Sequence, residues 1–265
     1  MTVFFLGSNG SLQSDISGNT SLLIDADNNL ILVDVSGAPS QSIRKAGYDP
    51  INLSAVVLTH SHVDHLYALP SLLHNLWLLK RSQPLRIIGN TKTLECAQAL
   101  CNVFGLLQKK GMFPIRWDIC DNKSIQLSEM FVHLFCVNHN VPTCGLVCTD
   151  TDFRLAYTAD TGFLDTIPAQ MYNADLLIHE AGGLASDETG LAAAGHSSAR
   201  QAAQTALKAN AKQLILCHLP LSPVVQQNML TEAAAVFPNT SLPLLFTQYK
   251  GRLPDKSFFS EKNRP

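Results

Sequence analysis

The segment Thr59–His65, with the sequence THSHVDH, constrains the fold of this chain more than any other feature. Four side chains that can bind a metal ion fall within it: His60, His62, Asp64 and His65. Imidazole nitrogens and carboxylate oxygens are suitable ligands for zinc, and also for manganese or iron. The apolar run Ala55–Leu58 directly before the segment predicts a buried strand. We therefore predict a metal site in the loop after this strand, where the first two histidines face one cation and the aspartate and third histidine face a second.

The composition favours a compact α/β protein over a disordered one. Hydrophobic residues make up 46% of the 265 residues and charged residues only 15%, which is enough apolar material for a large core. The formal net charge is −2, so no global positive field attracts nucleic acid, although a local patch would still suffice. We expect one domain over residues 1–265, with a peripheral tail from about residue 254.

The cysteines and the N-terminal segment bear on the compartment. The seven cysteines are scattered and odd in number, and Cys144 and Cys148 are too far apart for a redox Cys-x-x-Cys pair. We expect reduced, mostly buried thiols. The apolar start Met1–Gly7 is too short for a secretory signal, and no run approaches the roughly 18 apolar residues that cross a membrane. These features favour a cytoplasmic protein without a membrane partner.

Several other apolar runs also end at side chains that can bind a metal. The runs Val132–Val137, Asp175–Ile178 and Leu214–Cys217 are followed by His139, His179 and His218. A further run, Phe153–Tyr157, ends three residues before Asp160 and is predicted to form a hairpin with Leu146–Cys148. Loops at one edge of a sheet system can converge on one point although their residues are far apart in the sequence. The pattern therefore predicts that these strand ends share a site.

Helical patterns alternate with these strands. We predict a leucine-rich helix over Leu66–Lys80, a second over Thr91–Leu107 with Thr91 as its N-cap, and a third over Ala199–Ala209 capped by Ser197 or Ser198. A last helix is predicted over Pro223–Val236, followed by a short apolar run near Leu244. The alternation indicates an α/β fold.

The order of these motifs resembles the metallo-β-lactamase superfamily, and within it the ribonuclease Z-like phosphodiesterases without a substrate arm. The resemblance covers most of the chain and rests on motifs in this order: Phe5–Gly7 with Gly18–Thr20, His60–His65 with Ala68–Pro70, His139, Tyr157–Thr161, Leu177–Ala181, Gly195–Ala199 and His218. It implies an αββα sandwich, in which two mixed β-sheets are flanked by helices. The pair of His-Glu-Ala and Gly-His-Ser motifs separates this branch from the lactamases and glyoxalases.

The resemblance also implies a dinuclear site. One metal would be held by His60, His62 and His139 and the other by Asp64, His65 and His218, with Asp160 bridging. Two divalent ions about 3.5–4 Å apart can share a hydroxide that attacks a phosphate; zinc is the first choice, with manganese or iron as alternatives. Asp64 would also orient or deprotonate that nucleophile. Glu180 and His196 match the pair that gives a proton to the leaving oxygen.

Two departures from ribonuclease Z bear on the substrate. The arm that grips transfer RNA is inserted between the residues matching His139 and Asp160, but here that interval is only 160 − 139 = 21 residues. The last ligand, His218, is followed by Leu219–Ser222 instead of a serine and an arginine-aromatic pair. We therefore expect a phosphodiesterase for a small substrate such as a cyclic nucleotide. Transfer RNA 3′-processing is the alternative, and a non-catalytic, metal-bound nucleotide sensor or a lactamase or thioesterase fits less well.

Other polar and aromatic residues receive structural interpretations. His179 is interpreted as a packing histidine beside the site and not as a ligand, His74 and His133 as helix-surface and strand residues, and Tyr67 as a packing tyrosine. The stripe of Leu72, Leu73, Leu76 and Leu79 is interpreted as helix core. Because Trp77 and Leu78 keep that helix apolar nearly all round, a dimer face is the second interpretation, and we expect a homodimer.

Overall fold

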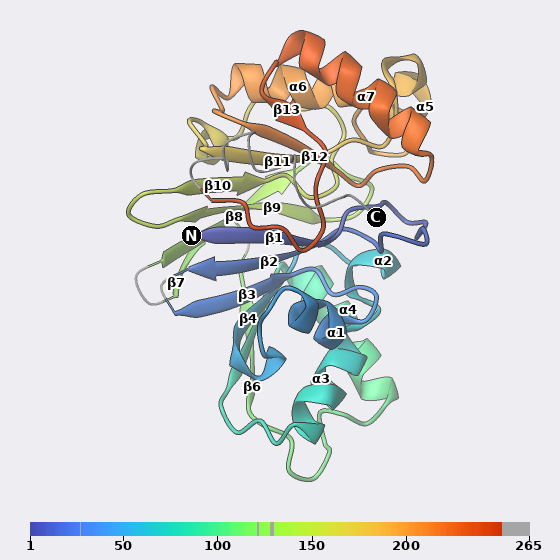
Figure 1. Cartoon of the computed structure of the whole chain (residues 1–265). Coiled ribbons are helices and arrows are strands. Elements are labelled where there is room, and N and C mark those ends of the chain that lie inside the picture. Colours follow the sequence, from blue (N-terminus) through green and yellow to red (C-terminus); the bar gives the residue numbers. More distant parts are fainter. Residues whose placement is uncertain (27, 121, 128–129, 251–265) are drawn as a thin grey trace, which may run out of the picture.

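Two β-sheets form the centre of the molecule, which is described here from a computed structural model covering residues 1–26, 28–120, 122–127 and 130–250. In these residues a six-stranded sheet runs in the order β1 to β6, and a seven-stranded sheet runs in the order β13-β12-β11-β10-β9-β8-β7. Helices α1, α3 and α4 cover the outer side of the first sheet, and α5, α6 and α7 cover that of the second (Figure 1). The predicted αββα sandwich with two mixed sheets is confirmed.

The elements have the following bounds. The strands of the first sheet are β1 Thr2–Gly7, β2 Ser21–Ala26, β3 Asn29–Val33, β4 Leu53–Leu58, β5 Leu85–Gly89 and β6 Ile115–Ile119. Those of the second are β7 Ser124–Leu127, β8 Met130–Val137, β9 Thr143–Thr149, β10 Arg154–Tyr157, β11 Leu176–Glu180, β12 Leu214–Cys217 and β13 Thr240–Ser241. The helices are α1 Pro39–Lys45, α2 Val63–Leu66, α3 Leu69–Leu78, α4 Thr91–Val103, α5 Glu188–Ala193, α6 Ala199–Lys208 and α7 Pro223–Val236.

Central strands of both sheets are apolar on both faces because each sheet is covered on one side by the other sheet and on the other side by helices. In β1, Val3 and Phe5 point into the core between the sheets, whereas Phe4 and Leu6 point toward the helices of the first layer. Successive side chains of a strand leave on opposite faces, so a run without polar residues can fill two cores at once. On the second sheet the outer core is made with the alanines of α6. The central strands are therefore fixed on both sides, and their ends can hold a site rigidly.

The helices differ from the predicted ones at their ends. In place of the predicted helix over 66–80 the structure has the shorter α3, which begins at Leu69 because Pro70, lacking an N–H, fits the first turn of a helix, and the short α2 lies before it, largely within the His60–His65 motif. Helix α4 ends at Val103 instead of Leu107, and its N-cap is Asn90, not Thr91: the Asn90 side chain accepts a hydrogen bond from the Thr93 N–H at 2.9 Å. Ser198 is the N-cap of α6, one of the two serines predicted.

The predicted hairpin between His139 and Asp160 is confirmed. Strands β9 and β10 pair antiparallel, with Leu146 opposite Tyr157. Strand β7 is absent from the sequence interpretation because it is short and mostly exposed. No strand forms at Leu244 in the described part of the chain, where β13 ends three residues earlier. The tail predicted from about residue 254 lies outside the described residues.

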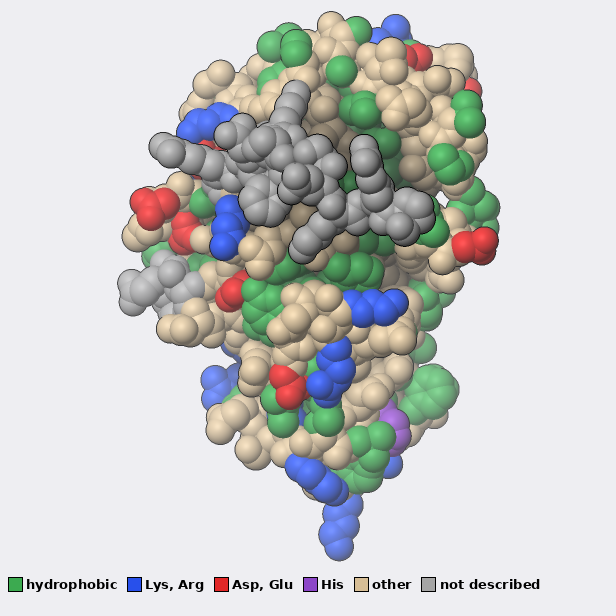
Figure 2. Space-filling view, viewed as in Figure 1, with side chains coloured by type: hydrophobic (Ala, Val, Ile, Leu, Met, Phe, Trp, Pro, Cys, Tyr) green, Lys and Arg blue, Asp and Glu red, His purple; other side chains and the backbone are tan. Residues whose placement is uncertain are grey.

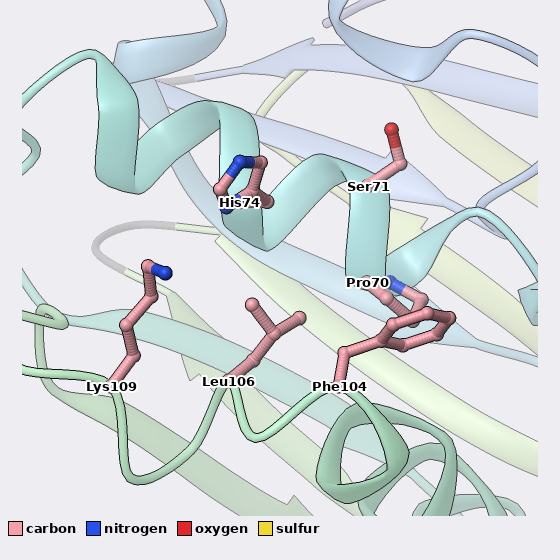
Figure 3. A pocket seen from close by; sticks show the side chains of 6 residues that line it. All are labelled: Pro70, Ser71, His74, Phe104, Leu106 and Lys109. Carbon is pink, nitrogen blue, oxygen red and sulfur yellow. The ribbon is translucent and has the colours of Figure 1, made fainter.

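The outer face of α3 carries the remaining apolar residues of the leucine-rich segment. Leu72, Leu73 and Leu76 are fully buried against the first sheet, as predicted, whereas Leu79 is 37% and Leu78 54% exposed. His74 lies on the surface of α3, as predicted, and lines a hollow of about 380 Å³ with Pro70, Ser71, Phe104, Leu106 and Lys109 (Figure 3). None of these described lining residues belongs to the predicted metal site.

Two further expectations concern cysteines and membranes. Five of the seven cysteines are buried: Cys101, Cys120, Cys144, Cys148 and Cys217. The prediction of mostly buried thiols is therefore confirmed. Among the described residues, no helix combines the length and the apolar character that a bilayer crossing requires.

Candidate metal centre and active site

The strand ends bring all the predicted ligands to one place. Three groups of side chains have potential ligand atoms within 4.8 Å of one another: His60, His62, His139 and Asp160; Asp64, His65 and His218; Asp160, His196 and His218. The contributing segments follow β4, β8, β10 and β12, with α2 supplying the aspartate and third histidine of the central motif. The first two groups coincide with the two ligand sets expected from the sequence.

Asp160 lies between these two sets. Its Oδ2 atom is 3.6 Å from His60 Nε2 and 4.0 Å from His139 Nε2, which belong to the first set. The same oxygen is 3.4 Å from His65 Nε2 and 3.2 Å from His218 Nε2, which belong to the second. Ala159 directly before it has a φ of +55°, a left-handed turn that aims the aspartate inward. One carboxylate therefore faces both sets, the position predicted for a bridging ligand.

The polar atoms at this point lack hydrogen-bond partners. Among the described residues, His60 Nε2, His65 Nε2, His218 Nε2 and Asp160 Oδ1 are buried without one. Unpartnered buried polar groups are costly, and imidazole nitrogens with carboxylate oxygens are the donor set that zinc, manganese and iron accept. The residues therefore fit a pair of divalent cations, which would satisfy these atoms.

The charges of the site also fit metal binding. Burial lowers the pKa of His60 to about 2, which keeps its imidazole neutral with a free lone pair. Burial alone would raise the pKa of Asp160, but His218 and His65 hold it well below its usual value. Burial likewise opposes ionisation of Asp64, yet His218 and His65 lower its pKa. The two carboxylates are therefore ionised when they face the histidine nitrogens.

A buried aspartate that the sequence interpretation did not select holds the central motif from behind. Asp34, directly after β3, accepts hydrogen bonds from the backbone N–H of Thr59 at 2.8 Å and from its hydroxyl at 2.8 Å. Its Oδ2 also lies 2.7 Å from His65 Nδ1. The other ring nitrogen of His65 is thereby turned toward Asp160. Asp34 fixes both the strand end before His60 and the orientation of His65, a supporting role common around metal ligands.

Replacing Asp34 with asparagine is expected to weaken metal binding by about 10- to 100-fold. An amide of the same shape has only one oxygen, so it cannot accept hydrogen bonds from the N–H and hydroxyl of Thr59 and also from His65 Nδ1. The apparent zinc affinity is measured by competition with a chelator, with circular dichroism as a check on folding. The control is Asp152→Asn, an exposed aspartate in the β9–β10 turn. Unchanged zinc affinity in Asp34→Asn would remove Asp34 from the support of the site.

The position before His196, Gly195, has to be a glycine because of its backbone conformation and its contact with His139. Its carbonyl oxygen lies 2.7 Å from His139 Nδ1, so the other ring nitrogen of His139 faces the site. Its φ is +74°, and a Cβ atom there would be 2.9 Å from the same imidazole nitrogen. Both the backbone conformation and the close approach require a residue without a side chain. The Gly-His-Ser motif therefore positions one histidine by its glycine and presents another.

Glu180 and His196 form a hydrogen-bonded pair beside the two ligand sets. Glu180 Oε1 lies 2.8 Å from His196 Nδ1 and accepts a bond from the Thr161 N–H at 2.8 Å. Burial raises the pKa of Glu180; burial also opposes protonation of His196, but the bond and charge of Glu180 raise the pKa of that imidazole. The ring of His196 is stacked on that of His218, with centroids 4.9 Å apart. The pair thus places an imidazole with a raised pKa next to the two candidate ligand sets.

The residues given structural interpretations lie outside these groups. His179 is fully buried in β11, and its Nδ1 lies 2.7 Å from the backbone oxygen of Glu180, in keeping with a packing histidine. Tyr67 accepts hydrogen bonds from the Gln13 side chain and from the Gly37 N–H, so it ties two loops together. His133 is a residue of β8 and lies 2.7 Å from the Ser124 hydroxyl.

The fold and the site define a family. Residues 20–219 match the family described as the beta-lactamase superfamily domain, and the chain belongs to this family. The predicted metallo-β-lactamase fold is confirmed, and the protein is a metal-dependent hydrolase of that superfamily.

The relatives are named ribonuclease Z. The enzyme of Prochlorococcus marinus strain AS9601 is 25% identical over 306 residues, which cover 91% of this chain and 97% of the relative. That of Pyrococcus abyssi is 30% identical over 157 residues, 57% of this chain, and the match spans only about half (49%) of that relative's length. The first alignment is longer than the 265 residues of this chain. The relative therefore carries segments that this chain lacks.

Solved structures share the fold. The metallo-β-lactamase fold protein YhfI of Bacillus subtilis has a TM-score of 0.79 at 24% identity, covering 94% of this chain and 98% of that one. The short form of human tRNase Z has a TM-score of 0.77 at 20% identity, covering 96% and 100%. A diphosphatase of the PhnP family has a TM-score of 0.74 at 18% identity, covering 94% and 97%. At these identities the likeness concerns the fold.

Proposed function

We propose that this chain is a dinuclear metal-dependent phosphodiesterase that hydrolyses a small phosphodiester such as a cyclic nucleotide. The observation that carries the proposal is the hydrogen-bonded Glu180–His196 pair, which lies next to two ligand sets that share Asp160. Metal-dependent hydrolysis of a phosphate ester uses ligands for cations and an acid for the leaving oxygen, and the side chains gathered here are candidates for both roles. The names of the relatives, which are nucleases, support a phosphodiester as the bond that is cleaved.

The ligand roles follow the two sets. His60, His62 and His139 hold one cation in this proposal, Asp64, His65 and His218 the other, and Asp160 lies between them. Zinc is our first choice of metal. When bound, two divalent cations stabilise the negative charge of the phosphoryl group and lower the pKa of water toward neutrality.

The acid and the orienting carboxylate are side chains of this chain. Because His196 Nδ1 is engaged by Glu180, its Nε2 is the atom that gives a proton to the leaving oxygen. Glu180 is fixed in turn by the Thr161 N–H, so the imidazole is held in one orientation. In this proposal Asp64 orients the attacking water; its Oδ2 lies 3.5 Å from His65 Nε2 and 3.8 Å from His218 Nε2.

The short segment between His139 and Asp160 supports a small substrate. The antiparallel β9–β10 hairpin fills this interval and pairs within the sheet, so the segment forms no protruding arm. Among the described residues on the face seen in Figure 2, lysine and arginine side chains are separated by polar and hydrophobic ones. The formal net charge of −2 likewise gives the chain no overall positive field for RNA.

The proposal is tested by a hydrolysis panel on purified protein supplied with zinc or manganese. The substrates are bis-p-nitrophenyl phosphate, the 3′,5′-cyclic purine and pyrimidine nucleotides, and a precursor transfer RNA. We expect turnover of the diester and of at least one cyclic nucleotide, with the RNA uncut. Binding of a cyclic nucleotide without turnover in any metal would support a sensor instead.

Ribonuclease Z activity is the second candidate because the relatives that cover 91% of this chain carry that name. Cleavage of the precursor at the 3′ acceptor boundary, with no cyclic activity, would favour this candidate. Strong salt dependence of RNA binding would accompany it, since each neutralised phosphate releases counterions.

A further inference from the structure

A hollow of about 430 Å³ opens beside the acid and one ligand set. His196 and His218 line it, together with the four leucines Leu12, Leu191, Leu219 and Leu221. Its volume is in the range of pockets that hold small organic ligands. No lysine, arginine, aspartate or glutamate is among the described residues that line it. Apart from its two histidines, the described lining of the hollow is therefore without ionisable side chains, at a site that is otherwise built from histidines and carboxylates.

Two glycines bring the floor of this hollow close to the site histidines. A Cβ atom on Gly10 would lie 2.9 Å from His218 Cε1. A Cβ atom on Gly182 would lie 2.9 Å from Leu191 Cδ2 and 3.5 Å from His196 Cβ. Backbone can approach the imidazoles this closely only without side chains. The backbone at Gly10 and Gly182 therefore packs closely against the two histidines, and Leu191 packs against the backbone of Gly182, just after β11.

We propose that this hollow is the leaving-group subsite and that it accepts an uncharged, apolar or aromatic group in preference to a further phosphate. This inference rests on the proposed function, in which His196 protonates the leaving oxygen. The group attached to that oxygen must then lie on the side of His196, and the leucine-lined hollow is on that side. Apolar walls favour a group that loses its hydration on binding.

Charge argues against a polynucleotide as the leaving group. Whichever P–O bond breaks, the strand of an RNA that leaves carries further phosphates, and proteins contact phosphates mainly with arginine, lysine and hydrogen-bonding groups. Leu219 and Leu221 also line an adjoining hollow, in which Asp15 is the one charged residue among those described. A negative charge on the substrate would therefore meet apolar walls and an acidic rim as it left the site.

The test compares two leaving groups that differ by one carboxylate group. Both substrates are methyl phosphodiesters: one of 4-nitrophenol, the other of 5-hydroxy-2-nitrobenzoate joined through its hydroxyl, a nitrophenol with a carboxylate at the meta position. The two phenols leave with similar ease, so chemistry is matched. We expect a kcat/KM for the neutral leaving group that is higher by on the order of tenfold or more, as for other pocket mismatches.

A cation placed in the hollow should reverse this preference. Leu221 is 42% exposed, so we expect Leu221→Arg to fold normally. In this variant we expect the ratio of the two kcat/KM values to shift by on the order of tenfold toward the substrate with the carboxylate. The control is Leu207→Arg, a 60% exposed leucine of α6 that does not line the hollow. An equal kcat/KM for both substrates, or the same ratio in Leu221→Arg as in the wild type, would overturn the subsite.

A binding measurement separates failure of the subsite from failure of the proposed function. Fluorine NMR follows 4-fluorophenol with the same proteins and needs no turnover. Line broadening that is present in wild type and in Leu207→Arg but lost in Leu221→Arg supports an apolar subsite. If this pattern is seen and neither diester is hydrolysed, the phosphodiesterase proposal fails and the subsite stands. Equal broadening in all three proteins overturns the subsite whatever the activity.

Discussion

Replacing Asp160 with asparagine should cost this protein at least about 10³-fold in kcat for diester hydrolysis, together with part of its metal. The physical reason is the position of Oδ2, which lies within 4.0 Å of nitrogens from both ligand sets. An amide has nearly the same shape, but it carries no charge to hold two cations together. Metal content is measured by mass spectrometry of the dialysed protein, and rates are measured with bis-p-nitrophenyl phosphate.

The matched control is Asp165→Asn, an exposed aspartate five residues further along the chain. It removes one negative charge of the same kind and should leave both metal content and rate unchanged. If Asp160→Asn instead retained two metals and the full rate, the shared carboxylate would not be a ligand. The two proposed ligand sets would then have to bind independently.

The parts of this site that can be predicted from the sequence are those where an apolar run leads into a metal-capable side chain. His60, His139 and His218 follow this pattern. A strand that packs against a core on each face is recognisable because its sequence is an unbroken apolar run. Asp34 follows it too, directly after β3. It is not identified as a site residue because its role depends on a left-handed turn, with φ of +57°, that points its carboxylate under Thr59. Nothing local in the sequence encodes that direction.

The differences at helix ends have a similar cause. Pro70 is compatible with either a kinked helix or a new one, and the structure contains a new one because the first turn of a helix tolerates a missing N–H. Asn90 and Thr91 are both good capping residues, and only the position of the Thr93 N–H decides between them. Such choices depend on tertiary packing. The site nevertheless assembles, because it depends on strand ends and not on helix boundaries.

Replacing His196 with alanine should lower kcat by about 10²- to 10⁴-fold for substrates with a poor leaving group, such as a cyclic nucleotide, while metal content stays intact. A ribose oxygen needs a proton as it leaves, whereas p-nitrophenolate leaves readily without one. The loss should therefore be much smaller with bis-p-nitrophenyl phosphate. The control is His74→Ala, which removes a surface histidine of α3 that lies outside the three ligand groups.

Glu180→Gln tests the same proton transfer through the effect of Glu180 on the pKa of His196. The hydrogen bond and charge of Glu180 raise the pKa of His196 against the opposing effect of burial. An acid must be protonated to act, so the rate should fall as the pH rises through the pKa of His196. With an amide in place of the carboxylate this pKa is lower, and the alkaline limb of the pH profile should move to lower pH. An equal loss for both leaving groups in His196→Ala, with an unmoved alkaline limb in Glu180→Gln, would mean that the pair is structural and that the proton comes from elsewhere.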